Sequence, residues 1–394
     1  RNETAFANRR TLAFIDARLE WLDREFRGSI RGLLSYKDFV VRETRAAFDE
    51  YLQADGINDS IDPDTLYFDV HNTAYTDSPD FSEYTHLCTL TSLMAEGYSD
   101  QYAYRPTAPM YSSVGQNPLD WPLYFVQFVD QQLRKANLGA RYIAYLKSDF
   151  LNASHPQYAH RRALMGMRTQ FQMRRAAISH FLDGALNQQQ YRWLVDMIVG
   201  LDEDVLASDV LLRERNLGRA MSPFRVAGHI VQGVYIFRDF NSDDPQFKLL
   251  YTPDAPDGVS FRPVTDYLQL LESHEMRSYY YHRVSYKGQP SVGTLYEQMA
   301  RGLKRDPESI KVLQPMVSAD DVITDVYKLY DTMLGRMIFD VDAQTTSTAE
   351  QWAEVLYTVV RWTGTILLLP FPLAGIAWGV VTSGVSFFRG AIAY

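Results

Sequence analysis

The stretch "HIVQGVYIFRDF" (229–240) decides the fold class, because the hydrophobic period changes here from helical to alternating. Apolar and polar residues alternate in it as they do in a half-buried β-strand. A second stretch of this kind, "QFKLLYTPDAPDG" (246–258), follows a polar connection at 241–245. The two stretches predict neighbouring antiparallel strands. A third, "SYYYHRVSY" (278–286), is typical of either a strand or a helix end.

Helical periodicity dominates on both sides of these strands. The first helix is the clearest, because Leu12, Leu19 and Phe26 fall on one face of it. A short strand is expected at 66–70. Further helices are expected at about 35–54, 121–137, 139–152, 157–187, 188–200, 264–273, 290–302 and 319–337. We therefore expect a mainly α (α+β) fold, in which a multi-helix body holds a small central antiparallel β element and ends in an apolar helical hairpin.

These patterns divide the chain into three expected parts. Residues 1–222 form a helical subdomain, 223–338 a mixed α/β subdomain and 339–394 the apolar helical hairpin. The chain opens at Arg1, where a complete translated chain has methionine, so we expect it to be a piece of a longer protein.

Composition and charge restrict the class of partner. The chain has 394 residues, a net charge of −9 and only one cysteine, Cys88. An acidic chain is a poor match for nucleic acid, whose phosphates need a basic surface. The mean hydropathy of −0.25 excludes a polytopic membrane protein. One cysteine excludes an intrachain disulfide. The apolar, helix-like surroundings of Cys88 favour a buried structural thiol over a nucleophile.

Motifs for catalysis and for cofactors are missing from the sequence. His274-Glu275 begins a zinc-protease motif, but position 278 is serine. There is no serine-hydrolase elbow, phosphate-binding loop or dinucleotide fingerprint. The acidic cluster Asp59, Asp62 and Asp64 lacks the glycine and distal glutamate of a calcium loop. We therefore expect no catalytic residue, no metal and no cofactor.

Three arginines recur every seven residues in the helix expected at 157–187. Arg161, Arg168 and Arg175 share one face of that helix. They form a possible stripe for an anionic surface such as lipid headgroups. The alternative is a face that pairs with the acidic residues of the chain itself.

The C-terminal segment carries the strongest hydrophobic signal. Residues 362–388 form an uncharged run, and this run is long enough to cross a bilayer. Pro370 and Pro372 interrupt one straight helix, so we expect a helix, a bend and a second helix. This hairpin either inserts into a membrane or stays buried in the protein core. The residues expected to insert are Ile366, Leu367, Leu368, Leu369, Pro370, Phe371, Pro372, Leu373, Ile376, Trp378, Val380 and Val381.

The apolar run holds no carboxylate of its own. Insertion triggered by acid usually requires carboxylates that become neutral. The nearest candidates lie upstream, and we expect any pH sensing from Asp340, Asp342, Glu350 and Glu354.

Three segments occur in an order that resembles a known family. They are "IDPDTLYFDV" (61–70), "FKLLYTPDAPDGVSFRPV" (247–264) and "STAEQWAEVLYTVVRWTGTILLLPFPLAGIAWGVV" (347–381). With them the chain resembles the N-terminal domain of dermonecrotic-type toxins over about residues 10–394. The second segment is the most specific of the three.

The resemblance implies a non-enzymatic module of a secreted bacterial toxin. Such a module binds the target cell and helps a C-terminal effector domain of the same polypeptide to cross a membrane. The implied partners are a host membrane or cell-surface receptor and that effector domain, and no nucleic acid. The alternative is a structural scaffold or chaperone-docking module that does not insert into a membrane.

Overall fold

The computed structural model of the chain describes residues 2–54, 56, 62–65, 67–72, 85–96, 102–106, 128, 136–264, 269–300 and 322–345. Its α-helices are α1 (Asn2–Ser29), α2 (Tyr36–Ala54), α3 (Leu90–Glu96), α6 (Leu138–Asp149), α7 (Tyr158–Leu182), α8 (Gln188–Val199), α9 (Glu203–Ser208), α10 (Val210–Arg215), α11 (His274–Tyr281), α12 (Gln289–Ala300) and α14 (Leu329–Thr345). Its strands are β1 (Tyr67–Asn72), β2 (Thr85–Thr89), β3 (Tyr102–Pro106), β4 (Arg219–Val226), β5 (His229–Asp239), β6 (Lys248–Tyr251) and β7 (Phe261–Pro263). The mainly α (α+β) class is confirmed.

A four-stranded antiparallel sheet lies in the middle of the chain, in the order β4-β5-β6-β7. The strands β5 and β6 confirm the two strand predictions, whereas β4 and β7 were not predicted. A two-residue turn joins β4 to β5. Ala227 and Gly228 both have positive φ in it, as the favoured type of two-residue hairpin turn requires.

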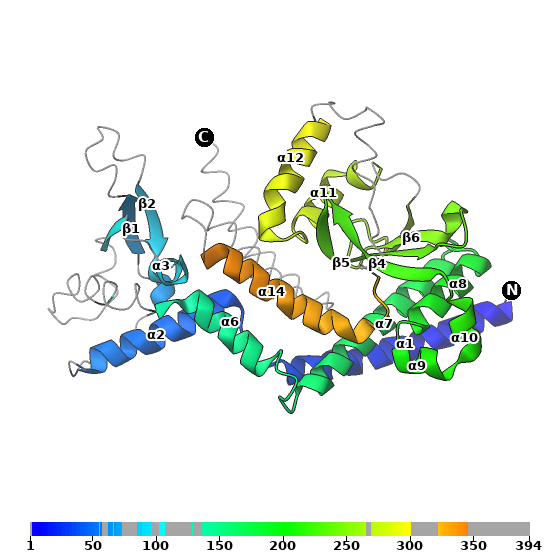
Figure 1. Ribbon diagram of the computed structural model, residues 1–394, viewed down its shortest axis with the longest axis horizontal. Helices are drawn as coiled ribbons and strands as arrows, with labels where there is room; N and C mark the ends of the chain where they lie inside the picture. Colours follow the sequence, from blue (N-terminus) through cyan, green and yellow to red (C-terminus); the bar gives the residue numbers. More distant parts are fainter. Residues whose placement is uncertain are drawn as a thin grey trace.

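Helices cover both faces of this sheet. Along β5, Val234 and Ile236 face a core shared with α11 and α12, while Tyr235 and Phe237 face a core shared with α7 and α8. Strict alternation in one strand therefore fills two separate cores. Figure 1 shows α11 and α12 on one side of the sheet and α7 and α8 on the other.

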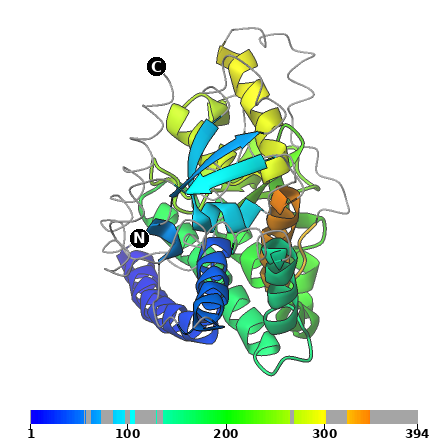
Figure 2. The same cartoon turned by 90° about the vertical axis from the view of Figure 1, so that its left-hand side faces the viewer.

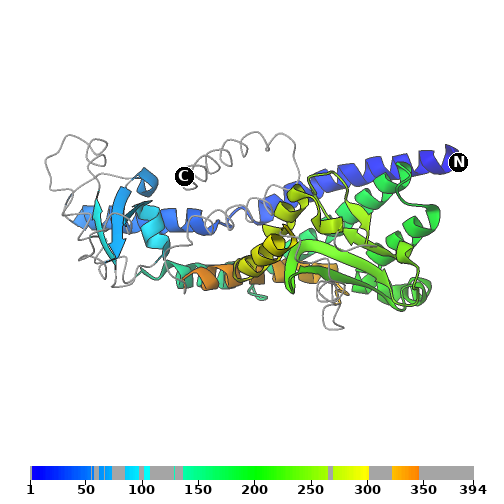
Figure 3. The same cartoon turned by 90° about the horizontal axis from the view of Figure 1, so that it is seen from above.

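The remaining helices form a second body along the length of the molecule. α2, α3, α6, α14 and the ends of α1 and α7 share one apolar core. α1 packs along α7, and α14 packs against α6 and α7. A three-stranded sheet, in the order β2-β1-β3, lies at the end far from the four-stranded sheet (Figure 1) and faces the viewer in Figure 2. Figure 3 shows α1 along one side of this elongated arrangement.

Two elements cross the predicted subdomain boundaries. β4 runs through residues 222 and 223, and it pairs along its length with β5. α14 runs through residues 338 and 339, and its buried residues Leu334, Met337 and Val341 belong to the core of the helical body. The boundaries at 222 and 338 thus fall inside regular elements.

Some segments differ from the sequence-based expectation. Cys88 lies in strand β2 and not in a helix, because β2 pairs with β1 at Phe68. Of the two alternatives for residues 278–286, the helix end is the one found, because residues 278–281 close α11. The Ser273 hydroxyl accepts a hydrogen bond from the Met276 amide and caps this helix at its start. Residues 322–325 are not helical, so the helix expected at 319–337 begins only with a 3₁₀ turn at Val326–Lys328 and continues as α14 to Thr345. The apolar hairpin lies outside the described residues.

Candidate functional site

The family-like segment 247–264 folds into β6, a closed loop and β7. Arg262 donates two hydrogen bonds to the Asp257 carboxylate, at 2.7 and 2.8 Å. The Thr252 hydroxyl donates to the Val259 carbonyl at 2.7 Å. Gly258 has a φ of +74°, which strongly favours glycine at this turn. The loop is therefore held in one shape by its own side chains.

His180, in the last turn of α7, holds the C-terminal side of this loop. Its Nε2 atom accepts hydrogen bonds from the backbone amides of Ser260 at 3.2 Å and Phe261 at 3.3 Å. The Phe261 ring meets the imidazole edge to face, with centroids 6.2 Å apart. Because Nε2 is an acceptor, the neutral imidazole carries its proton on Nδ1.

Protonation of His180 opposes this arrangement. An imidazolium has two N–H donors and no acceptor, so Nε2–H would face two backbone N–H groups. Burial lowers the pKa of His180, the nearby Arg262 lowers it further, and Asp183 acts in the opposite direction. These are the charged groups that act on the imidazole. The contact is therefore stable at neutral pH and is weakened by acid.

The other side of the loop is held by the end of α11. The Tyr279 hydroxyl donates to the Pro253 carbonyl at 2.7 Å, and Arg283 donates to the same oxygen at 3.4 Å. Arg283 also lies over the Tyr279 ring. The loop is thus a junction between α7 beneath the sheet and α11 above it.

Asp340, one of the four acidic residues predicted to sense pH, is buried in α14. Its carboxylate accepts from Arg336 Nε at 2.7 Å and from the Tyr286 amide at 3.1 Å. Burial raises the pKa of Asp340, although Arg336 and the Tyr286 amide lower it. A raised pKa in the folded state means that protonation favours the folded state. Asp340 therefore takes up a proton at a higher pH than an ordinary aspartate. This protonation stabilises the folded state, whereas an acid-triggered release would require it to destabilise that state.

The other residues predicted to sense pH or to insert into a membrane are exposed or lie outside the described residues. Asp342 is exposed on α14. Glu350, Glu354 and all twelve residues predicted to insert into a membrane, from Ile366 to Val381, lie outside the described residues. Among the helices that the structure describes, none combines the length and apolar character that a bilayer crossing requires.

The arginine stripe lies at the interface of α7 with α1. Arg168 is buried and forms an ion pair with Asp23. Arg161 is also buried, donates to the Ser29 and Asp149 carbonyls, and lies over the Phe150 ring. Arg175 is exposed and pairs with Asp16. Arg161 and Arg168 therefore do not form an exposed surface for anions. The three arginines instead bind carboxylates and carbonyls of the protein itself.

The acidic cluster near residue 60 has a structural use where it is described. Asp62 accepts from the Asp64 amide and pairs with Arg45, while Asp64 pairs with Lys37. Asp59 lies outside the described residues. Within the described part of the chain, no group of histidine, cysteine and acidic residues could hold a metal ion.

His180 was missed by sequence reasoning. The only local signal was its position at the end of a helix rich in arginine, and eight histidines are spread through the chain. Its partners lie 80 and 81 residues away, so no motif could have found it.

The fold is that of a mainly helical module in which helices surround a short antiparallel sheet. A family model described as "Dermonecrotic toxin, N-terminal domain" matches residues 31–279. This match covers more than half of the chain and includes the whole β6–β7 segment at 247–264. The chain therefore belongs to the dermonecrotic toxin N-terminal domain family. A comparison with curated proteins finds no match.

Proposed function

We propose that this chain is the non-enzymatic delivery module of a secreted bacterial toxin. It binds a target-cell membrane or receptor and carries a C-terminal effector domain of the same polypeptide across a membrane. Membership of a toxin N-terminal domain family supports this proposal. The uncharged run at 362–388 supplies the apolar length that membrane entry needs.

The observation that carries the proposal is the contact of His180 with the β6–β7 loop. Its Nε2 accepts two backbone amides, and acid removes that acceptor. Histidine normally titrates near pH ~6.5, within the range that a maturing endosome crosses. In this proposal, acid loosens α7 from the sheet, and the apolar segment after α14 then enters the bilayer.

Release of a trapped dye from anionic liposomes tests the proposal. The chain is added at neutral pH and the suspension is then acidified; we expect release to begin as the pH falls. Ile376→Asp places a charge in the apolar run and should abolish release. The matched control is Leu211→Asp, which places the same charge on a leucine that is already exposed on α10.

The outcomes separate the two readings of the module. Release that is lost in Ile376→Asp and kept in Leu211→Asp supports membrane entry. Absence of release from the unmodified chain at every pH would overturn the proposal. In that case the scaffold or chaperone-docking role is favoured, and co-purification of the chain with a dedicated chaperone would support it.

A further inference from the structure

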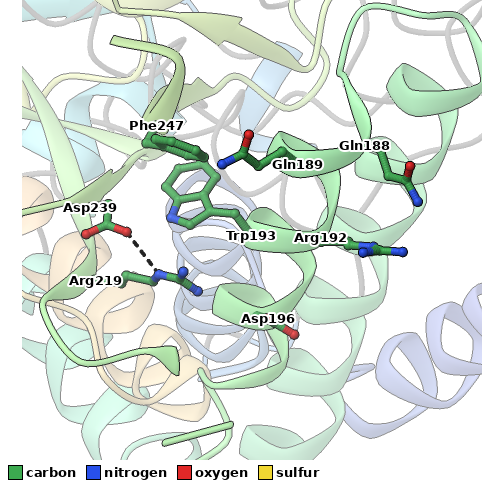
Figure 4. A pocket seen from close by; sticks show the side chains of 8 residues that line it. All are labelled: Gln188, Gln189, Arg192, Trp193, Asp196, Arg219, Asp239 and Phe247. Carbon is green, nitrogen blue, oxygen red and sulfur yellow. Dashed lines mark hydrogen bonds and ion pairs between the residues drawn. The ribbon is translucent and has the colours of Figure 1, made fainter. Parts of the chain in front are cut away.

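A surface hollow of about 530 Å³ lies between the start of α8 and the adjoining edges of β4 and β5. Its size is within the range of about 300–1,000 Å³ typical of small-molecule sites. Figure 4 shows Trp193 and Phe247 at its centre, the Arg219–Asp239 pair on one side and Gln189 on the other. None of these residues takes part in the His180 junction.

Two buried donors at this hollow have no acceptor among the described residues. Trp193 is only 3% exposed, and its indole Nε1–H makes no hydrogen bond there. Arg219 donates through Nε to Asp239 at 3.1 Å, but its buried Nη1 makes none. In Figure 4 the indole nitrogen faces the Arg219–Asp239 pair. Buried donors without acceptors are rare and costly, so each requires an explanation.

Acceptors lie beside these donors. The Asp239 carboxylate accepts from Arg219 and from the Asn241 amide, and the Asp196 carboxylate pairs with Arg215 at 3.3 Å. Each carboxylate oxygen can accept more than one hydrogen bond. The hollow therefore presents donors and acceptors of both charges within one small space. Its two carboxylates are balanced by two lining arginines, Arg192 and Arg219, so its charge favours neither an anion nor a cation.

An apolar ring completes the set. Phe247 is only half-buried and meets Trp193 edge to face, with ring centroids 5.5 Å apart. A second hollow of about 360 Å³ lies beside the first and shares Asp239 and Phe247 with it. The Phe247 side chain thus borders both spaces.

We propose that this hollow binds a neutral sugar. Sugar hydroxyls both donate and accept, so a single pyranose ring can satisfy the two orphan donors and the carboxylates together. The apolar face of the ring can lie on Phe247. This assignment goes beyond the delivery function and does not rest on it, because none of its residues belongs to the acid-sensitive junction or to the apolar run.

The test is a titration of the folded chain, labelled with ¹⁵N, with galactose and with glucose. We expect saturable movement of the Trp193 indole resonance, with a Kd on the order of 1 mM for the better sugar. Trp193→Phe identifies the resonance. Two other probes are titrated in the same way: acetate as an anion and N-methylacetamide as a peptide group. Movement with either of these but with neither sugar would overturn the assignment, as would no movement with any of them.

Calorimetry on variants locates the site. Trp193→Phe keeps an aromatic ring but removes the N–H, and we expect about tenfold weaker sugar binding. Arg219→Lys keeps the charge but removes Nη1, and it gives the same readout if Trp193→Phe does not fold. Trp21→Phe is the matched control, because Trp21 is 37% exposed on α1 and does not line the hollow. Equal weakening in Trp21→Phe, or unchanged binding in both site variants, contradicts the proposal.

A disaccharide distinguishes a free sugar from the end of a longer glycan. If the second hollow accepts another ring, lactose binds more tightly than galactose, and the natural ligand is a glycan chain. If both bind equally, the site takes a single sugar. Either result keeps the proposal; saturable binding of neither galactose nor lactose overturns it.

Discussion

The imidazole Nε2 of His180 accepts a hydrogen bond from the Ser260 amide across 80 residues of chain. It also accepts one from the Phe261 amide, so one side-chain atom joins the last turn of α7 to the start of β7. The contact exists only while the imidazole is neutral. A reversible change in pH therefore acts on a junction between the helical body and the sheet.

His180→Gln is expected to reduce the loss of stability on acidification. A histidine whose folded pKa is lowered contributes stability above its unfolded pKa, and this is lost as the pH falls through the folded pKa. Glutamine accepts the same two amides but does not titrate. Between about pH 7.5 and 5.5, we expect wild type to lose on the order of 1 kcal/mol more than the variant in urea unfolding.

The control for this prediction is His160→Gln. His160 is exposed on the same helix, so its replacement should leave the pH dependence of unfolding unchanged. If His180→Gln and His160→Gln both follow wild type, His180 is not the residue that couples stability to pH.

Asp340→Asn is expected to make the loss on acidification steeper. Burial raises the pKa of Asp340, so its contribution to stability is present at low pH and is lost as the pH rises through the folded pKa. As the pH falls, the free energy of unfolding of wild type therefore rises through Asp340 and falls through His180. In the asparagine variant only the decrease through His180 remains. The measurement is the urea midpoint at several pH values.

The exposed Asp243, in the connection between β5 and β6, provides the comparison, and the curve for Asp243→Asn should run parallel to that of wild type. A flatter curve for Asp340→Asn would show that protonation of Asp340 destabilises the folded state. It would also restore Asp340 as the residue that releases α14 in acid.

The α1–α7 interface contains two ion pairs of different burial, and the buried one should carry more of its stability. Asp23 is 8% exposed beside Arg168, whereas Asp16 is 43% exposed beside Arg175. Asp23→Asn leaves Arg168 charged in a buried site, and we expect a loss of about 3 kcal/mol. Asp16→Asn should cost less than about 0.5 kcal/mol, because solvent screens the exposed pair.

Urea unfolding at neutral pH measures both losses. Adding Arg168→Met to an Asp23→Leu background removes both charges and should recover much of the loss. Equal effects of Asp23→Asn and Asp16→Asn would show that burial does not set the strength of these pairs.

The sequence pattern predicted those helices and strands whose buried residues repeat with the period of the element. The stripe of α1 and the alternation of β5 were readable because burial repeats with the period of each element. The Ser273 cap of α11 was equally local, but the three consecutive tyrosines at 279–281 are compatible with a strand as well as with a helix end. For such short apolar segments, the pattern alone cannot separate helix from strand.

Partners far apart in sequence were not readable. β2 is a strand because it pairs with β1, and that pairing is a tertiary contact that outweighs the apolar, helix-like composition around Cys88. The arginines of α7 were placed on one face correctly. Only the structure reveals that α1 covers that face, with Asp23 opposite Arg168. The direction in which a charged face points depends on which helix packs against it.

Two glycines in long helices should respond to alanine with opposite signs. A Cβ at Gly166 of α7 would overlap the ring of Tyr327, and that ring is fixed because its hydroxyl donates to Asp202 at 2.8 Å. Gly166→Ala should therefore cost about 1–3 kcal/mol. A Cβ at Gly335 of α14 meets no described atom within 4 Å, so Gly335→Ala should stabilise the helix by up to about 1 kcal/mol. Chemical unfolding of the two variants beside wild type decides the matter. A gain at Gly166 would mean that Tyr327 moves aside freely and that the close approach of α7 to the segment before α14 is not needed.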